Sequence, residues 1–191
     1  LELEHSLYNH MCQSSELQRL LSWQLRRRGR TTTGVRYSVR GNRASGDMNT
    51  ALGNCLIMII MVSTFMDGKF YEMLDDGDDC LIFVEQEDVE WLANNIAASF
   101  REFGMIIKLE NRATRLEDIE WCQCHPVEIT PGTWKYIRSP SKILSTCLTS
   151  AKYTDSMKAC GRLVKSVGLC ELMLAQGVPV LQEFAKMLIR S

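Results

Sequence analysis

Four aspartates gather around a single glycine in the segment LDDGDDCLIFVE. They are Asp75, Asp76, Asp78 and Asp79, on either side of Gly77. Carboxylates this close repel one another unless a cation neutralises them, and hard oxygen ligands suit Mg²⁺ or Mn²⁺. The alternative is a solvated acidic turn, because Asp and Gly are common turn residues. A calcium-binding loop is disfavoured, since neither the spacing of the acids nor a closing Glu fits one.

A second polar cluster lies in RGNRASGDMNTALGN. If a helix starts near Asp47, the side chains of Asp47, Thr50 and Asn54 share one face at spacings of three and four. Ser45 and Gly46 precede that helix, where backbone N–H groups favour phosphate. The stripe predicts a site for a sugar or a base. The alternative is that these residues are a helix cap and ordinary surface residues.

The charge is unevenly distributed, although the net charge is only −1. Between residues 17 and 46 there are eight arginines and no acid, whereas residues 67–120 hold fifteen acids and five bases. From residue 121 onward there are nine bases and four acids. This pattern suits a polyanion held near an acid-bound cation. The hydrophobic fraction of 46% and charged fraction of 24% exclude a disordered acidic tail and a collagen-like repeat.

The eight cysteines do not predict a disulfide framework. Several lie in apolar runs, where a free Cys behaves as a small hydrophobe, and no signal peptide opens the sequence. We therefore expect a reducing compartment. Zinc at Cys122, Cys124 and His125 is disfavoured, because no second ligand pair stands at finger spacing. The longest apolar stretch, residues 56–65, is too short to span a bilayer.

The hydrophobic pattern also predicts the elements that would position these side chains. Residues 26–34, with two Gly and three Thr, and the Gly-rich residues 41–46 are expected to be loops. The expected elements are one or two helices over 2–25, a strand over 35–40, a helix over 47–66, strands over 69–74 and 80–85, a helix over 86–103, a strand over 105–110, strands over 119–129 and 133–138, and helices from 141 with a break at 177–179. This order predicts an α+β fold with a largely antiparallel sheet.

Together the two polar clusters resemble a known family. The pattern SG-x₃-T-x₃-N, followed about twenty residues later by GDD in an apolar hairpin, resembles motifs B and C of viral RNA-dependent RNA polymerases. SGDMNTALGN is most similar to the tombusvirus and carmovirus group of positive-strand RNA viruses. FGMIIKLE resembles motif D, and IEWCQCHPV resembles motif E, the primer grip. The resemblance implies the palm subdomain of a right-hand polymerase over residues 1–140, followed by the helical start of the thumb over 141–191.

The resemblance also implies catalytic roles. Asp78 matches the principal ligand of two catalytic Mg²⁺ or Mn²⁺ ions, and Asp79 matches a weaker or partner-mediated ligand. Lys108, in G-x₃-K with Gly104, matches the motif D lysine that protonates the leaving pyrophosphate. A solvated lysine at the end of a strand would produce the same pattern.

Binding roles follow in the same way. Ser45, Thr50 and Asn54 match the motif B residues that position the incoming nucleotide and test its 2′-OH. Gly46 belongs to the same motif, and Asp47 occupies an extra acidic position typical of this group.

RNA contacts are expected at the primer-grip turn and at the arginine-rich residues 17–46, called the basic segment below. The alternative for the first is a plain edge strand, and for the second a solvated basic loop. The basic segment would line the path of template or nucleotide as a phosphate funnel. The expected RNA-binding residues are Trp121, Cys122 and Gln123 of the primer-grip turn and Arg36, Arg40 and Arg43 of the basic segment.

The function expected is that of an RNA-directed RNA polymerase of a positive-strand RNA virus, which adds nucleotides to an RNA 3′-OH by two-metal catalysis. The partners implied are template and nascent RNA, nucleoside triphosphates and another viral replicase protein. The implied location is the host cytoplasm, at membrane-associated replication complexes.

One departure from the family pattern matters. Motif A, an Asp followed five residues later by another Asp, occurs nowhere in the sequence. We expect a fragment cut after motif A that also lacks the basic motif F of the fingers and is inactive alone. The alternative function is a non-catalytic RNA-binding or scaffold module. A reverse transcriptase is disfavoured, because Gly77 stands where that family has a bulky aromatic residue.

Overall fold

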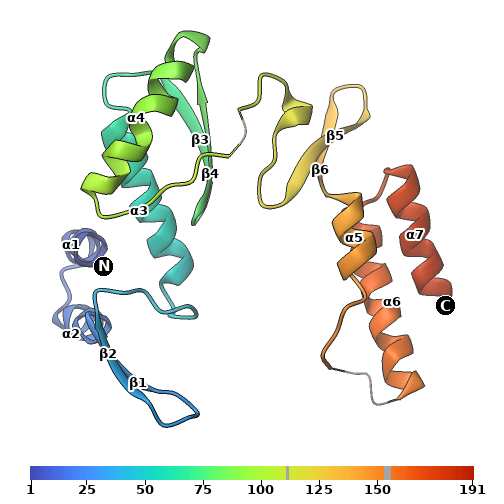
Figure 1. Cartoon of the computed structure of the whole chain (residues 1–191), viewed down its shortest axis with the longest axis horizontal. Helices are drawn as coiled ribbons and strands as arrows, with labels where there is room; N and C mark the ends of the chain where they lie inside the picture. Colours follow the sequence, from blue (N-terminus) through green and yellow to red (C-terminus); the bar gives the residue numbers. More distant parts are fainter. Residues whose placement is uncertain (111, 153–155) are drawn as a thin grey trace. The chain divides into compact units, whose positions relative to one another are not determined.

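The computed structural model describes residues 1–110, 112–152 and 156–191 (Figure 1). The chain forms two compact units, Leu1–Leu109 and Glu110–Ser191. Both mix helices with antiparallel strands, which confirms the α+β class. The described residues form three separate two-stranded sheets rather than the one larger sheet expected. None of the helices described is long and apolar enough to cross a membrane.

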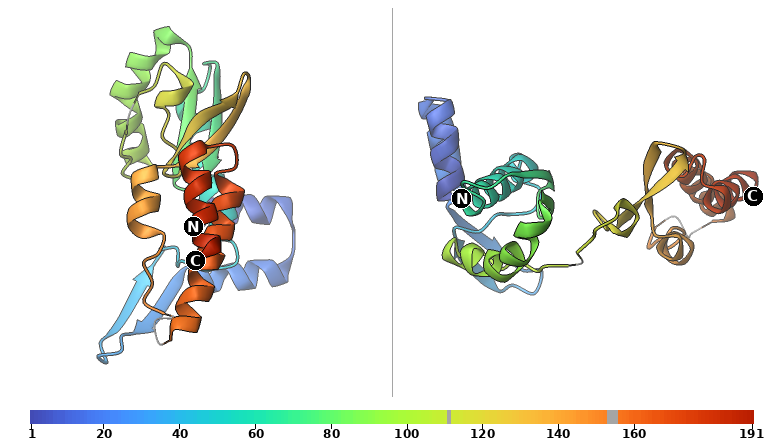
Figure 2. Two further views of the ribbon diagram at one scale, coloured as in Figure 1. Left: turned by 90° about the vertical axis from the view of Figure 1, so that its right-hand side faces the viewer. Right: turned by 90° about the horizontal axis from the view of Figure 1, so that it is seen from above.

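The first unit begins with two helices, α1 (Glu2–Met11) and α2 (Ser15–Gln24), as the sequence predicted. They lie side by side (Figure 2). Helix α2 starts where it does because the Ser14 hydroxyl accepts a hydrogen bond from the Leu17 N–H at 3.3 Å and so caps its first turn.

A ribbon of two antiparallel strands follows, β1 (Arg26–Arg30) and β2 (Arg36–Arg40). The prediction of a loop over 26–34 was therefore wrong for β1. Gly29 pairs with Tyr37 in the register, and a Cβ on Gly29 would come within 2.6 Å of the tyrosine ring. The ring of Tyr37 therefore lies directly over the backbone of β1 at Gly29, where a side chain would collide with it. The threonines that also argued against a strand fall partly in the connecting turn.

The core of the first unit is built by α3 (Thr50–Phe65), the hairpin β3 (Tyr71–Asp76) and β4 (Asp79–Val84), and α4 (Val89–Glu102). A short 3₁₀ turn, η1 (Gln86–Asp88), leads into α4. The buried residues of this core are Met61, Val62, Met66, Ile96 and Phe100. Alternate residues of the hairpin pack on the two helices, so the hairpin has one face on a rigid base.

Two expectations for this unit were wrong. Helix α3 begins at Thr50 rather than at Asp47, because Asp47 lies in the preceding turn and its carbonyl accepts the Thr50 N–H at 3.0 Å. Residues 105–110 are not a strand. Ile107 does pack on the core, but the hairpin forms a sheet of two strands only and does not pair with this segment.

The second unit contains η2 (Leu116–Asp118), β5 (Cys124–Thr130) and β6 (Thr133–Arg138), which form a hairpin, and the helices α5 (Pro140–Thr146), α6 (Met157–Leu174) and α7 (Pro179–Arg190). Ile137 of the hairpin packs with Ile143, Ala175 and Leu181 of the helical part. The hairpin therefore belongs to the same compact unit as the helices. The division into palm and thumb at residue 140 stays a prediction.

Candidate active site

The turn between β3 and β4 places its acids at the tip of the hairpin. Asp76 pairs with Asp79 in the register, so Gly77 and Asp78 form a two-residue turn. Gly77 has φ +83°, a conformation that favours glycine at such a position. Its N–H donates a hydrogen bond to Asp75 Oδ1 at 3.1 Å, which steadies the turn. Asp78 is exposed at the tip, where its carboxylate is accessible to a cation or a substrate.

The helix that carries the second polar cluster meets this turn. A Cβ placed on Gly77 would lie 3.5 Å from the Cβ of Asn54 and 3.9 Å from its Nδ2. Asn54 is in the second turn of α3, and Thr50 is one turn earlier on the same helix. Two clusters more than twenty residues apart in sequence are thus brought into contact. The structure therefore brings the two motifs together, and their forming one site stays a prediction.

Burial sets the electrostatics behind the turn. It raises the pKa of Asp75, against the effect of hydrogen bonds from the Cys55 thiol and the Gly77 N–H, and the neighbouring Asp76 raises it further. Burial and the charge of Asp75 also raise the pKa of the Cys80 thiol to about 11. Cys80 is therefore a protonated, apolar neighbour of the site at neutral pH, rather than a nucleophile.

The residues fit a divalent metal in kind but only in part. Asp78 and Asp79 supply the hard oxygen ligands that Mg²⁺ and Mn²⁺ prefer. Within residues 1–110, 112–152 and 156–191, however, no group of three or more His, Cys, Asp or Glu side chains is arranged to hold an ion. A complete site needs carboxylates beyond those of this hairpin.

The loop before α3 holds the remaining residues of the second cluster. Ser45 and Gly46 are exposed, and Gly46 has φ +86°. The Thr50 hydroxyl donates to the Ala44 carbonyl at 3.0 Å. The carboxylate of Asp47 is bound by the guanidinium of Arg27, with Nη1 to Oδ1 at 3.2 Å. Because Asp47 precedes the helix, it does not share the helix face of Thr50 and Asn54, which the sequence had suggested.

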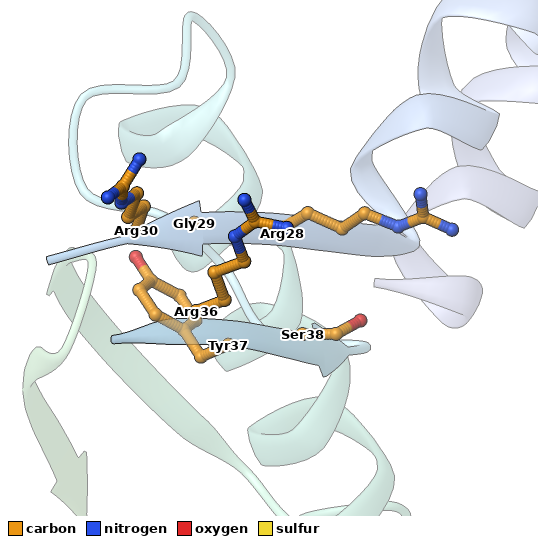
Figure 3. A pocket seen from close by; sticks show the side chains of 6 residues that line it. All are labelled: Arg28, Gly29, Arg30, Arg36, Tyr37 and Ser38. Atoms are coloured by element: carbon orange, nitrogen blue, oxygen red, sulfur yellow. The ribbon is translucent and has the colours of Figure 1, made fainter. Parts of the chain in front are cut away.

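The basic segment divides into exposed and partly buried arginines. Arg36 and Arg40 are exposed on β2, and the Arg40 guanidinium lies 3.6 Å from a carboxylate oxygen of Glu2. Arg43 is instead directed inward, where it pairs with the buried Glu4. Figure 3 shows arginines of both strands around the Tyr37 ring, in a pocket lined by Arg28, Gly29, Arg30, Arg36, Tyr37 and Ser38.

The predicted primer-grip residues form a tight turn in the second unit. Trp121 and Cys124 exchange two backbone hydrogen bonds of 3.0 and 2.9 Å, and the two residues between them, Cys122 and Gln123, have φ of +51° and +63°. Both therefore occupy the left-handed region that glycine and asparagine prefer. The Lys142 ammonium donates to Gln123 Oε1 at 3.2 Å. The resemblance implied this turn, whereas the hydrophobic pattern predicted a strand through residues 119–129, because neither residue is a typical turn signal; strand β5 begins only at Cys124.

Lys108 is exposed in the irregular segment 105–110. Sequence reasoning also missed the partners of the loop before α3, namely Glu4, Gln24, Arg27, Asn49 and Gly53. Their signal is weak, because Glu4 lies 39 residues from Arg43 and 45 from Asn49 along the chain.

Comparison with known proteins shows the family to which the chain belongs. The whole chain, residues 1–191, matches the family model described as viral RNA dependent RNA polymerase. The chain belongs to this polymerase family. It is 38% identical to the RNA-directed RNA polymerase of Tobacco necrosis virus (strain D), over 97% of this chain and 27% of that protein. The enzyme of Turnip crinkle virus is 36% identical over all of this chain and 25% of its own length. That of Tomato bushy stunt virus (strain Cherry) is 31% identical over 96% and 23%.

These polymerases confirm the resemblance to the tombusvirus and carmovirus group. The chain spans about a quarter of the length of these curated relatives. Its matched part includes both polar clusters, since the family model extends over all 191 residues.

Proposed function

We propose that this chain forms one side of the nucleotidyl-transfer site of an RNA-directed RNA polymerase from a positive-strand RNA virus. The observation that carries the proposal is the contact between Asn54 of α3 and Gly77 of the β3–β4 turn, in a chain that belongs to the polymerase family. That contact sets a polar helix stripe beside a carboxylate turn. A ribose and a metal-bound triphosphate need these two surfaces side by side.

The carboxylate turn is the metal side of the site. Asp78 is the principal ligand and Asp79 the second, and their oxygens suit two Mg²⁺ or Mn²⁺ ions. Such ions, when bound, favour the attack of an RNA 3′-OH and stabilise the charge on the leaving pyrophosphate. The hairpin contributes rigidity, because its inner face packs on α3 and α4 and the Gly77 N–H holds the turn through Asp75.

The helix stripe is the nucleotide side. Asn54 and Thr50 face the ribose, and Ser45 and Gly46 lie on the exposed loop before the helix. Asp47 belongs to the same surface, and its pairing with Arg27 limits the repulsion between its carboxylate and a triphosphate. Lys108 is the proton donor to the leaving pyrophosphate.

Two surfaces serve the RNA. Arg36 and Arg40 of the ribbon bind phosphates, while the exposed Tyr37 offers a ring for stacking. Trp121, Cys122 and Gln123 form the turn that holds the 3′ end of the growing strand. Residues 1–140 are the palm part and 141–191 the start of the thumb. The partners are template and nascent RNA, nucleoside triphosphates and another replicase protein, in the host cytoplasm at membrane-associated replication complexes.

The substitution Asp78→Ala in the intact polymerase tests the proposal. It removes the principal metal ligand, so nucleotide addition should fall by about a thousandfold or more, several kcal/mol of transition-state stabilisation. The measurement is extension of a primed RNA template with Mg²⁺. Asp67→Ala is the matched control, because Asp67 is an exposed aspartate in the turn after α3, outside the site. Near-normal extension by Asp78→Ala would refute the assignment and favour the non-catalytic RNA-binding module.

A further inference from the structure

We propose that the buried ion pair Glu4–Arg43 is a positioning device for the loop 41–49, and through it for the nucleotide side of the site. The inference rests on the proposed function. Neither side chain is placed against substrate, so both are positioning residues rather than catalytic ones.

The pair is withdrawn from solvent. The Glu4 side chain, on α1, has 0% of its surface exposed, and the Arg43 side chain, on the loop, has 14%. The guanidinium binds both carboxylate oxygens, with Nη1 to Oε1 at 3.4 Å. Nη1 also donates to the carbonyl of Asn49 at 3.3 Å. One arginine thus connects the loop, α1 and the residue that precedes α3.

A hydrogen-bond network extends from this pair to α2. The Asn49 amide donates to Glu4 Oε1 at 2.7 Å, and Gln24 Nε2 donates to Asn49 Oδ1 at 2.8 Å. The ring Nε2 of His5 lies 3.1 Å from Gln24 Oε1. Both N-terminal helices are therefore bound to Asn49, the residue that precedes α3.

The pair lies directly against the backbone of α3. A Cβ on Gly53 would overlap Glu4 Oε1 and lie 2.6 Å from Arg43 Nη1. Gly53 is therefore required by the close approach of the carboxylate, not by an unusual backbone conformation. It immediately precedes Asn54, the residue that meets the carboxylate turn.

A second ion pair holds the other side of the loop. Arg27 binds the Asp47 carboxylate, and its Nε donates to the Asn42 carbonyl at 3.1 Å. The loop needs such restraints, because Gly41 and Gly46 both have positive φ and leave it conformationally free. The Arg27–Asp47 pair and the Glu4–Arg43 pair therefore hold the segment around Ser45 at both of its ends.

Stability alone gives a poor reason for the buried pair. Removing two charges from water costs about as much as their attraction returns, and apolar residues of similar volume often stabilise a fold as well or better. The pair instead contributes conformational specificity, because its hydrogen bonds favour one arrangement of the loop. A binding site gains from such preorganisation, because misplacement of a substrate by about 1 Å can slow a reaction a hundredfold.

The first test compares Glu4→Gln with Glu2→Gln in the intact polymerase. Glu2 is on the same helix, but its side chain is 74% exposed, so the control removes the same charge without touching the buried pair. For Glu4→Gln we expect kcat/KM for a matched ribonucleotide to fall about tenfold or more, mainly through KM, and the preference for ribo- over deoxynucleotide to fall as well. Glu2→Gln should leave both unchanged.

The second test disturbs the pair while keeping both charges. Gly53→Ala forces the Glu4 carboxylate aside, whereas a Cβ on Gly161, in α6, meets no atom within 4 Å. Both changes replace a helical glycine by alanine, so they have the same intrinsic effect on helix propensity. We expect Gly53→Ala to reproduce the change in KM and in sugar preference, and Gly161→Ala to have no such effect.

The outcomes separate this inference from the proposed function. Activity is counted per folded active site, well below the melting temperature of each variant. If Glu4→Gln and Gly53→Ala lower only the melting temperature, with KM and sugar preference unchanged, the pair is merely structural and the inference is wrong. If Glu4→Gln does not fold, Gly53→Ala decides. A failure of the proposed function would appear instead as extension that survives Asp78→Ala.

Discussion

Asn54 is the residue on which the proposed site depends, because it lies against the carboxylate turn. Its amide can both donate to and accept from a sugar hydroxyl. A site that hydrogen-bonds a hydroxyl discriminates against the analogue without it, since its own polar group is then left unpaired. Under the proposed function, Asn54 tests the ribose next to the proposed metal ligands.

Replacing Asn54 by Ala should weaken that test. We expect the ratio of kcat/KM for a matched ribonucleotide to that for its deoxynucleotide to fall by about ten- to a hundredfold, equivalent to about 1–3 kcal/mol. Leu52→Met is the control, because Leu52 is exposed on α3 and the substitution keeps an apolar side chain there. Equal slowing of both substrates by Asn54→Ala would mean that the residue is structural.

Asp75 gives a prediction about pH. Burial raises its pKa, so the folded protein binds a proton here more tightly than the unfolded chain does. The free energy of unfolding must then decrease as pH rises through the interval between the unfolded and the folded pKa. Asp75→Asn removes this dependence. We expect thermal melts at a series of pH values to show the variant gaining on the original protein as pH rises above the ordinary Asp value of 3.8, and a constant difference would contradict a raised pKa at Asp75.

At the scale of elements, the β3–β4 hairpin and the helix that follows could be predicted from sequence, because local signals agree there. DDGDD between apolar runs encodes a tight turn, and the residues of α4 repeat with helical period. Strand β1 could not, since Gly29 resembles a breaker until Tyr37 is known to lie over it. The expected strand over 105–110 did not form, because an apolar pattern does not specify a pairing partner: Ile107 packs on the core, but the segment pairs with neither strand of the hairpin.

The ribbon β1–β2 also carries a prediction about RNA. Arg36→Ala should lower the dependence of single-stranded RNA affinity on salt by about one released counterion, because one phosphate contact is lost. Tyr37→Ala should instead weaken binding by about 1–3 kcal/mol at an unchanged salt dependence, since stacking releases no counterion. Fluorescence anisotropy of a labelled oligonucleotide at several salt concentrations measures both quantities.

Arg101→Ala is the matched control for the ribbon, because Arg101 is exposed near the end of α4 and outside the basic segment. It should change neither the affinity nor the salt dependence. If Arg36→Ala behaved like Arg101→Ala, the ribbon would be a solvated basic loop.

At the scale of the whole molecule, two long-range contacts within the first unit differ in how far the sequence could predict them. The contact between Asn54 and Gly77 was implied by the family motifs, whereas the network around Glu4 was not. Its members come from α1, α2 and the loop before α3, and no local pattern connects residues 39 positions apart. Buried polar pairs of this kind are specified by tertiary structure alone, so periodicity cannot reveal them.

The 191-residue chain by itself should not synthesise RNA. Its sequence has no Asp followed five residues later by another Asp, and the chain spans about a quarter of its curated relatives. Two ions would then have too few carboxylates. We expect no template-dependent incorporation by the purified chain with Mg²⁺ or Mn²⁺. Incorporation that disappears with Asp78→Ala would show that this view of the missing motif is mistaken.

The approach of the Glu4 carboxylate to Gly53 has a consequence for how these polymerases can diverge. A side chain at position 53 would force the ends of the Glu4 and Arg43 side chains to shift, so we expect these three positions to change together. A larger residue at position 53 is accommodated without displacing the ion pair only where that pair has been lost. Among relatives, a larger residue at position 53 should therefore occur only where positions 4 and 43 have both become smaller or uncharged.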